Sequence, residues 1–236
     1  MIQNKRVLII IPAFNEEKNI RQILTEIQDL HLPYDFLVID DGSQDETRQR
    51  AKDSGALVVR LPFNVGIGGA VQTGFKYALK EKYDFVLRVD ADGQHDVRYL
   101  AALAEPVLND RADLTVGSRF IPPFLGYQSS FVRRIGINFF AWLISGLTHL
   151  AVTDSTSGFR AYNQKMIRLF ADDYPTDFPE PEEIMMAKKA GVRFQEVPVE
   201  MRKRQQGLSS IRYLSTLYYM IKVTFAILMN TLKKKG

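Results

Sequence analysis

The chain contains 236 residues, of which 46% are hydrophobic and none is cysteine, and its formal net charge is +4. This length is enough for one hydrophobic core, and no linker, repeat or low-complexity tract divides the sequence. The lack of cysteine excludes a disulfide framework, a thiolate metal site and a thiol nucleophile. The mildly basic balance is compatible with nucleic acid, with a membrane surface or with neither, so it selects no partner.

Three short apolar segments occur early in the chain, at residues 7–11, 36–40 and 57–59. They contain β-branched residues and do not alternate between apolar and polar positions, which is typical of parallel strands covered by helices on both faces. Polar residues and then a helical pattern follow the first two. The sequence therefore predicts an α/β fold with a mostly parallel central sheet flanked by helices.

The loops after the first two segments have different signatures. Residues 12–16, Pro-Ala-Phe-Asn-Glu, precede an amphipathic run that extends to Leu30. In residues 40–47, Ser43 and Glu46 have the spacing of a capping box, which predicts the start of a helix.

A glycine-rich loop follows the third segment, at residues 64–70. It does not match the dinucleotide-binding fingerprint, because Val71 stands where glycine is required and the next glycine is Gly74. Two interpretations remain. The loop lets the backbone closely approach a ligand or the loop of Asp90 and Asp92, or it is the glycine-rich entry to a tightly packed helix.

Residues 85–95 are the most informative part of the sequence, because an apolar segment runs directly into Asp90 and Asp92. Side chains alternate along a strand, so both carboxylates are predicted to point the same way at its carboxyl end. Such hard oxygen ligands hold Mg²⁺ or Mn²⁺ and leave coordination positions free for the phosphates of a nucleotide. The alternative is an acidic turn that caps the next helix. We expect the adjacent His95 to be an exposed residue of this turn.

In an open α/β sheet, ligands bind beyond the carboxyl ends of the strands. The four polar segments after the apolar segments all fall at such ends. We therefore expect them to meet at one crevice.

Eight short motifs occur in order along the chain. The first four, P-x-F-N-E, D-D-G-S-x-D-E-T, N-x-G-x-G-G-A and D-A-D-G-Q-H, resemble those of the family 2 inverting glycosyltransferases, which implies a Rossmann-like domain of GT-A fold. The others look like the branch that moves a sugar to dolichyl or undecaprenyl phosphate: residues 117–119, 157–160, 196–199 and 204–209. The resemblance extends to Ser210, so we expect a GT-A domain at residues 1–210.

The resemblance also implies roles for individual residues. It places the nucleotide sugar near Pro12, Phe14, Glu16, Asp41 and Asp90. It places a Mg²⁺ or Mn²⁺ cofactor at Asp90, Asp92 and Gln94. It implies that phosphates are surrounded by Arg119, by Arg133 or Arg134, and by Arg204 with Ser209, and that the acceptor phosphate contacts Arg133, Arg134 and Ser209. The residues expected to be catalytic are Asp92, Arg119 and Arg204.

The chain departs from this branch at Ser210, where many members have lysine. One phosphate contact is therefore absent, or it is supplied by Arg202, Lys203 or Arg212. Guanidinium groups match phosphate geometry bidentately, and transfer from a nucleotide sugar to a lipid phosphate brings three phosphates into one pocket. The alternative for each arginine is a place on a solvated basic surface.

The chemistry of the acceptor decides whether a general base is needed. A phosphate monoester is already anionic at neutral pH and can attack the anomeric carbon unaided. A sugar hydroxyl would require a carboxylate base, and Glu182 or Glu183, with Glu180 beside them, lies about where base-using relatives carry one. The alternative is that Pro181 starts a helix and the glutamates favour its positive end.

We expect a UDP-hexose donor rather than GDP-mannose, and a product used in the assembly of cell-surface polysaccharide or glycoconjugate. A nucleotidyltransferase is disfavoured, because residues 12–17 contain neither glycine nor a basic residue. A non-catalytic, membrane-associated sugar-nucleotide binding protein would not keep Asp90 and Asp92.

The C-terminal segment, residues 211–236, is predicted to be an amphipathic helix. Residues 214–232 contain a single charged residue, Lys222, and three lysines follow. The segment approaches the roughly 20 apolar residues of a spanning helix but is too polar for one, so an interfacial helix fits better. The alternative is a helix docked on the domain or in an oligomer.

Residues 135–152 form a second stretch without formal charge, apart from His149 when it is protonated. In it, Trp142 with Phe139 and Phe140 is positioned either to contact a polyprenyl chain or to form a buried core helix. No secretory signal precedes the first strand, so we expect the chain at the cytoplasmic face of the membrane. Further candidate partners are a small separate membrane protein and a second copy of the chain, whereas nucleic acid is not expected.

Overall fold

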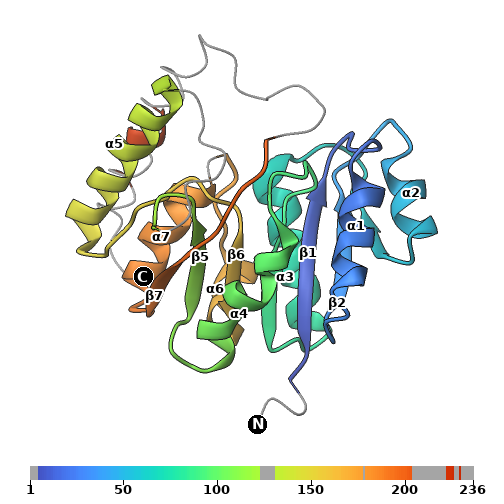
Figure 1. Ribbon diagram of the computed structural model, residues 1–236, viewed down its shortest axis with the longest axis horizontal. Coiled ribbons are helices and arrows are strands. Elements are labelled where there is room, and N and C mark those ends of the chain that lie inside the picture. The colour runs from blue at the N-terminus through green and yellow to red at the C-terminus, as the bar shows by residue number, and fades with distance from the viewer. Residues whose placement is uncertain (1–4, 123–130, 178, 204–221, 226–228, 230–236) are drawn as a thin grey trace.

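The computed structural model describes residues 5–122, 131–177, 179–203, 222–225 and 229, and the side chains of residues 131–133 are not included (Figure 1). Within these residues, seven strands form one sheet in the order β3-β2-β1-β4-β6-β5-β7. The strands are β1 (Val7–Ala13), β2 (Asp35–Asp40), β3 (Leu57–Arg60), β4 (Phe85–Arg88), β5 (Leu114–Ser118), β6 (Arg160–Asn163) and β7 (Phe194–Pro198). The helices are α1 (Ile20–Asp29), α2 (Thr47–Asp53), α3 (Gly66–Lys80), the 3₁₀ turn η1 (Val97–Tyr99), α4 (Leu100–Leu108), α5 (Phe131–Thr148), α6 (Gln164–Asp172) and α7 (Pro179–Lys189).

The sheet is parallel except at β6. β1 pairs in parallel with β2 and β4, β2 with β3, and β5 with β7, whereas β6 runs antiparallel to both β4 and β5. The prediction of a mostly parallel sheet flanked by helices is confirmed. The reversed strand has a consequence for the site, because the start of β6 lies at the same edge of the sheet as the ends of β4 and β5.

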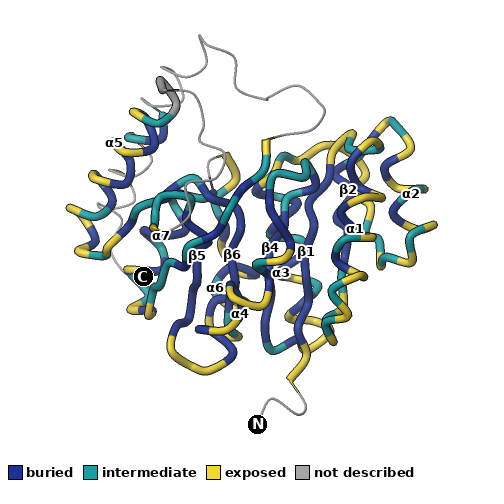
Figure 2. The backbone as a smooth tube through the Cα atoms, in the orientation of Figure 1, coloured by how far each residue is buried: buried dark blue, intermediate teal, exposed yellow. Residues whose placement is uncertain are grey.

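The core lies on both faces of the central strands, which are the darkest part of Figure 2. Ile9 and Ile11 of β1 pack in a cluster with α1 and α4, whereas Leu8 and Ile10 pack in a second cluster with α3 and α6. Every residue of β1 is buried, which explains its unbroken apolar sequence. Burying each Leu or Ile side chain stabilises the folded state by about 1.5–3 kcal/mol relative to leaving it exposed.

A third, smaller cluster joins α5 to α7 and to the C-terminal segment. Phe140 and Ile144 of α5 pack there with Ile184 of α7 and with Val223, which is fully buried. Trp142, on another side of α5, is 72% exposed. The interpretation of residues 135–152 as a buried core helix therefore holds for the face with Phe140 and Ile144, whereas contact of Trp142 with a polyprenyl chain stays a prediction.

The structure corrects one expectation about a loop and decides between two interpretations of another. The capping box is wrong: Ser43 Oγ accepts from the backbone amide of Asn15 at 3.0 Å, and Asp45, not Ser43, accepts from Thr47 N at the start of α2. The glycine-rich segment proves to be the entry to a packed helix. A Cβ at Gly68 would collide with the backbone of Pro175 and Thr176, and one at Gly74 would lie 3.0 Å from Ile10.

The predicted domain boundary at residue 210 and most of the predicted C-terminal helix lie outside the described residues. The described residues of that segment, 222–225 and 229, are helical. Across the part of the chain that the structure describes, none of the helices combines the length and apolarity needed to cross a bilayer.

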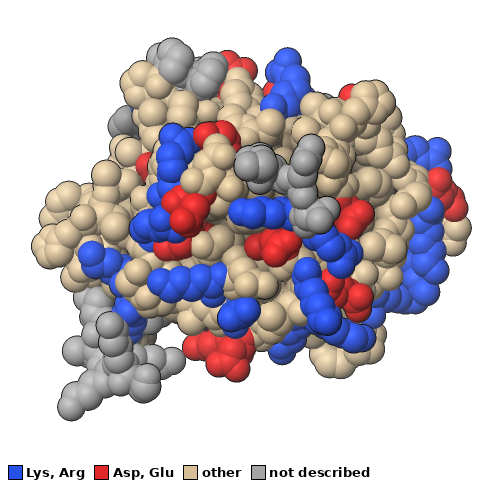
Figure 3. Space-filling view, turned by 90° about the horizontal axis from the view of Figure 1, so that it is seen from below, with Lys and Arg blue, Asp and Glu red and all other residues tan. Residues whose placement is uncertain are grey.

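Figure 3 shows the edge of the sheet at which β1 begins, opposite the carboxyl ends of the parallel strands. Basic and acidic side chains lie next to one another on this face.

Candidate active site

The loops after β1 and β2 bind each other at the carboxyl edge of the sheet. Asn15 N donates to Ser43 Oγ at 3.0 Å, and Glu16 N donates to Thr47 Oγ1 at 2.8 Å. In return, Gln44 N donates to the side-chain oxygen of Asn15 at 3.0 Å. These bonds satisfy backbone groups that no helix or strand uses, and they fix the shape of the edge.

The three nucleotide candidates on the first loop have different surroundings. Pro12 is buried at the end of β1, whereas the ring of Phe14 is 43% exposed. The carboxylate of Glu16 accepts from Asn19 Nδ2 at 2.6 Å. Phe14 is therefore the member of this group whose side chain is most available to a ligand.

Asp41 is buried and caps the glycine-rich helix. Its two carboxylate oxygens accept from Val65 N at 2.8 Å and from Gly66 N at 3.0 Å, so its charge lies at the positive end of α3. Burial raises the pKa of the Asp41 carboxyl, although these two backbone bonds act in the opposite direction. A nucleotide that contacts Asp41 would meet a side chain already held by the loop of β3.

Asp90 and Asp92 follow β4, which ends at Arg88, and Asp92 lies in a turn. Both carboxylates thus lie beyond the carboxyl end of the strand, and the common direction expected from strand alternation stays a prediction. Asp90 accepts from Arg88 Nε at 3.0 Å, and Asp92 accepts from the backbone amide of Gln94 at 3.0 Å. All three candidate metal ligands, including Gln94, are half-exposed.

The donor set fits a nucleotide-borne cation. Within the described residues, no group of three or more His, Asp or Glu side chains is arranged to hold a metal by itself. Mg²⁺ characteristically uses one or two protein carboxylates and completes its shell with water and substrate phosphates. Asp90 and Asp92, with Gln94 next to them on the same loop, match that pattern.

His95 is buried behind Asp90, so the prediction that it is exposed is wrong. Its side chain is only 5% exposed, its ring stacks on Phe159 with 4.9 Å between centroids, and its Nδ1 accepts from Asp90 N at 3.0 Å. Burial lowers the pKa of His95. A neutral imidazole that accepts at Nδ1 carries its proton on Nε2, which lies 3.8 Å from Asp90 Oδ2.

A buried ionic cluster around Arg88 holds Asp90 in place. Arg88 is 1% exposed, and its Nη2 donates to Glu180 at 2.7 Å while its Nε holds Asp90. Burial alone would lower the pKa of Arg88, but Asp90 and Glu180 raise it well above its ordinary value. Burial would likewise raise the pKa of Asp90, and Arg88 lowers it below its usual value. Asp90 is therefore held ionised and in place.

Glu183 belongs to the same cluster and is fully buried. Arg160 Nη1 donates to it at 2.8 Å, the hydroxyl of Tyr162 donates at 2.9 Å, and Tyr174 donates to its other oxygen. This candidate base has no exposed surface with which to meet a substrate. Glu182, the other candidate, is half-exposed on α7.

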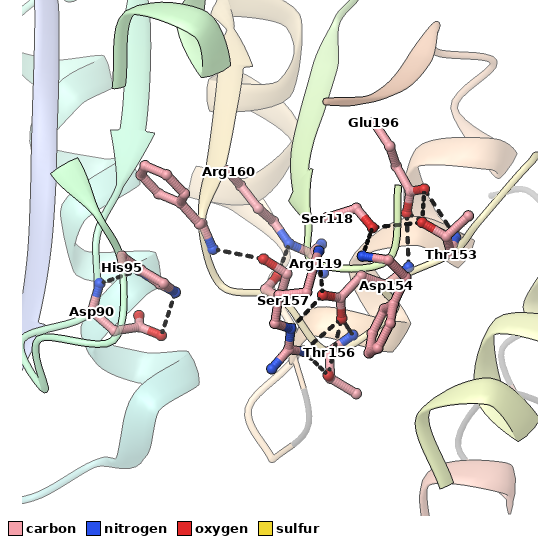
Figure 4. Close-up of polar contacts among 12 residues, drawn as sticks. Asp90, His95, Ser118, Arg119, Thr153, Asp154, Thr156, Ser157, Arg160 and Glu196 are labelled. Atoms are coloured by element: carbon pink, nitrogen blue, oxygen red, sulfur yellow. Dashed lines mark hydrogen bonds and ion pairs between the residues drawn. The ribbon is translucent and has the colours of Figure 1, made fainter. Parts of the chain in front are cut away.

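Arg119 is the candidate phosphate ligand with the clearest surroundings (Figure 4). Its Nε and Nη2 donate to the two oxygens of Asp154, each at 2.7 Å, and Nη2 also reaches Thr156 Oγ1 at 2.9 Å. Asp154 is fully buried. Arg119 is thus oriented by a bidentate pair and is 11% exposed.

Glu196 holds the loop that carries Asp154. It accepts from the backbone amides of Thr153 and Asp154, each with a bond of 3.0 Å, and from Thr153 Oγ1 at 2.6 Å. Burial raises the pKa of Glu196, although these hydrogen bonds lower it. The motif of residues 196–199 therefore shapes the surroundings of Arg119 through Asp154.

The remaining acceptor candidates are placed only in part. Arg204, Ser209 and Arg212 lie outside the described residues, as does the side chain of Arg133, and Arg134 is half-exposed on α5. Lys203 is exposed. The structure thus brings together Asp90, Asp92 and Gln94 on one loop, but it does not show the acceptor group assembled.

Four residues that shape the site had no predicted role: Arg88, Asp154, Arg160 and Glu196. The role of Arg88 could have been inferred from the sequence, because an arginine inside an apolar strand needs a buried partner. Arg160 and Glu196 stand in motifs that the sequence singles out. Nothing in the sequence pairs Asp154 with Arg119.

Comparison with known proteins agrees with this architecture. The model of the family described as "Glycosyl transferase family 2" matches residues 8–173. An undecaprenyl-phosphate mannosyltransferase of Micrococcus luteus is 31% identical over 225 residues, covering 87% of each chain. A UDP-N-acetylglucosamine–dolichyl-phosphate N-acetylglucosaminyltransferase of Methanococcus voltae is 29% identical, covering 84% of this chain and 86% of that one.

A solved structure shares the fold. Glucosyl-3-phosphoglycerate synthase of Mycobacterium tuberculosis, crystallised with Mn²⁺, UDP-glucose and phosphoglyceric acid, superposes with a TM-score of 0.72 at 22% identity, covering 99% of this chain and 82% of that one. An uncharacterised protein of Methanocaldococcus jannaschii is 34% identical over 97% of this chain and 93% of its own. The chain therefore belongs to glycosyl transferase family 2 and is a transferase enzyme, as its motifs predicted.

Proposed function

We propose that this protein transfers a hexose from a nucleoside diphosphate sugar to a polyprenyl phosphate, with inversion and with Mg²⁺ or Mn²⁺ as cofactor. The observation that carries the proposal is the metal loop, residues 90–95, at the carboxyl edge of the sheet. There Asp90 is fixed by Arg88 at 3.0 Å and still keeps 29% of its side chain exposed. The names of the relatives from Micrococcus luteus and Methanococcus voltae support the lipid phosphate acceptor.

A UDP-hexose is the donor that we propose. The Methanococcus voltae relative is named for a UDP sugar, and the structural neighbour holds UDP-glucose with Mn²⁺. Phe14 is exposed at the end of β1, and Asp41 lies at the next loop, where a nucleoside would contact both. When bound, the cation neutralises the charge that develops on the departing diphosphate.

The protein's own task is positioning. A polyprenyl phosphate is anionic at neutral pH, so no proton has to be removed before it attacks the anomeric carbon. Arg88 and His95 hold Asp90, and Asp154 orients Arg119, so these groups need no rearrangement as charge develops. Arg119, Arg133, Arg134, Arg204 and Ser209 are the residues that we propose for the phosphates.

A second acceptor class, a sugar hydroxyl, stays open because of one residue. Glu182 is half-exposed near the start of α7, unlike the buried Glu183. A hydroxyl acceptor would need such a carboxylate as its base. The lipid phosphate is preferred, because it explains the resemblance of the downstream arginine motifs without a base.

We further propose that the end of the molecule around α5 faces the inner surface of the membrane. α5 contains no acidic residue, and it exposes 53% of Ile135, 72% of Trp142 and 40% of Leu147. In the C-terminal segment, Phe225 is 64% exposed. Apolar and aromatic side chains with lysines nearby are typical of interfacial helices. A small separate membrane protein would be a further anchor, and the product would serve cell-surface polysaccharide or glycoconjugate assembly.

The test is release of UDP from UDP-glucose and other UDP-hexoses, with and without undecaprenyl phosphate in liposomes. We expect turnover that requires both Mn²⁺ and the lipid phosphate. Asp92→Asn should abolish it, because the metal loses a charged ligand, while the exposed Asp172→Asn serves as a matched control. Glu182→Gln should keep substantial activity.

Two results would contradict the proposal. Full activity of Asp92→Asn in chelator-treated protein would exclude the metal site. Loss of about 10²- to 10⁴-fold in Glu182→Gln, with donor binding intact, would instead identify a hydroxyl acceptor and a general base.

A further inference from the structure

The chain that leaves β7 runs along the metal loop. We call residues 199–203 the exit segment. Val199 N donates to Ser118 O at 3.0 Å, Arg202 N donates to Gln94 O at 2.8 Å, and Met201 forms an antiparallel bridge with His95. The exit segment therefore joins the loop that carries Asp90 and Asp92 immediately before the R-x-x-G-x-S motif begins at residue 204.

The side chain of Arg202 reinforces this junction. Its Nη1 donates to Glu26 of α1 at 2.6 Å, and its Nη2 donates to Asp96 at 3.0 Å. Arg202 is 30% exposed and Asp96 only 2%, so the second pair is largely shielded from water. One guanidinium thus connects the exit segment to the nucleotide half of the sheet and to the residue that follows His95.

Asp96 has a second arginine partner that makes no such connection. Arg98 donates to both oxygens of Asp96, with Nε at 3.0 Å from each, but its side chain is 69% exposed and belongs to the same turn as Asp96. Both arginines therefore neutralise the same carboxylate, and Arg202 is the one that reaches it from the exit segment. This makes Arg98 a matched control for Arg202.

We propose that Arg202 is a positioning residue that couples occupation of the metal loop to the order of the exit segment, and through it to binding of the acceptor. The inference rests on the proposed function. Filling the metal loop fixes Gln94 and His95, whose backbones pair with those of Arg202 and Met201 in the exit segment. The ion pairs of the Arg202 side chain hold the two segments together. Such coupling is reciprocal, so the acceptor should in turn tighten binding of the donor.

Hydrogen exchange measured by mass spectrometry on the full chain tests the coupling without turnover. The backbone amide of Arg202 is a direct reporter, since it donates to Gln94 O. In the wild type, Mn²⁺ with UDP should slow exchange both at residues 90–95 and at residues 199–203. In Arg202→Gln the first effect should remain, while the second falls by about tenfold or more.

The control variants separate coupling from loss of charge or fold. Arg98→Gln should behave as the wild type, and Glu26→Gln, which removes one of the two ion pairs, should lie between. Circular dichroism confirms that each variant is folded. In steady-state assays, Arg202→Gln should raise the KM for undecaprenyl phosphate more than the KM for the donor, whereas a general loss of structure would affect both and lower kcat.

Each contrary outcome has a separate meaning. Unchanged exchange at residues 90–95 in the wild type would show that Mn²⁺ and UDP do not bind there, which overturns the proposed function and the coupling with it. Protection at residues 90–95 without protection at residues 199–203 would overturn the coupling alone. An Arg202→Gln response equal to that of the wild type, or an equal loss in Arg98→Gln, would show that Arg202 is not the positioning residue.

Discussion

Around β1 and β2, the loops at the sheet edge are joined by hydrogen bonds between short polar side chains and backbone amides, as between Ser43 and Asn15. Around β4, β5 and β6, arginine–carboxylate pairs join the elements, as between Arg160 of β6 and Glu183 of α7. The first kind of contact replaces water at a half-exposed backbone group. The second neutralises charges that have been removed from water altogether, so losing one partner leaves the other buried and unpaired.

The strongest way to test this contrast is to remove the central carboxylate of the buried cluster. Glu183→Gln leaves Arg160, and in part Arg88, without its counter-charge, and we expect the free energy of unfolding to fall by about 3–5 kcal/mol. Urea denaturation followed by circular dichroism measures it. The half-exposed Glu182→Gln on the same helix should change the value by less than about 1 kcal/mol. Similar losses in both variants would remove the distinction between buried and exposed acids of α7.

Gly158→Ala should break the link between the cluster and the metal loop. A Cβ at this position would lie 2.5 Å from Asp90 Oδ2 and 3.0 Å from Arg88 Nη2. We expect a loss of about 1–3 kcal/mol from overpacking and a weakening of Mn²⁺-dependent UDP binding by about 10- to 100-fold. Calorimetric titration measures the binding. In Gly146→Ala, where a Cβ meets nothing within 4 Å, neither loss should occur.

The nucleotide half should respond more mildly. Asp41→Ala removes the acceptor of the Val65 and Gly66 amides, and helix caps of this kind contribute about 0.5–2 kcal/mol. The same variant should weaken UDP binding, since we propose that Asp41 meets the nucleoside. Asn64→Ala removes an exposed acceptor of the same Gly66 amide, and its stability should fall less. Denaturant melts of the two variants would contradict the expectation if Asn64→Ala proved the more damaging.

An ion pair near the surface should have the smallest effect and should depend on pH. Asp113 accepts from Arg193 N at 2.7 Å, and although burial opposes it, Arg193 lowers the pKa of Asp113 below its ordinary value of 3.8. A carboxyl whose pKa is lowered on folding stabilises the protein above the ordinary value and loses this contribution as the pH falls through the lowered one. The difference in Tm between the wild type and Asp113→Asn should therefore be constant near pH 7 and shrink below 3.8. A difference that grows on acidification would reverse the assigned direction.

The same contrast explains what could be predicted from the sequence. Parallel strands and polar loops at their ends follow from local patterns, so the sheet class and the segments near Phe14, Asp41 and Asp90 were predicted. Pairs between distant residues are not local. From the sequence alone Arg119 is predicted to be a phosphate ligand, and its pairing with Asp154 is missed because nothing in the sequence joins the two residues. His95 is predicted to be exposed, because its stacking on Phe159 depends on the reversed strand β6.

The reversed strand also bears on how the protein folds. In the register of β4 and β6, Arg88 stands directly opposite Arg160, and like charges so placed repel each other. Asp90 and Glu180 neutralise Arg88, whereas Glu183 of α7 lies 2.8 Å from Arg160 and 3.8 Å from Arg88, so its arrival favours the pairing of the two strands. We expect α7 to dock before or together with β6, so that the second half of the sheet forms in one concerted step. A slower refolding rate of Glu183→Gln in stopped-flow experiments would place this carboxylate in the folding nucleus, whereas faster unfolding alone would place its docking after it.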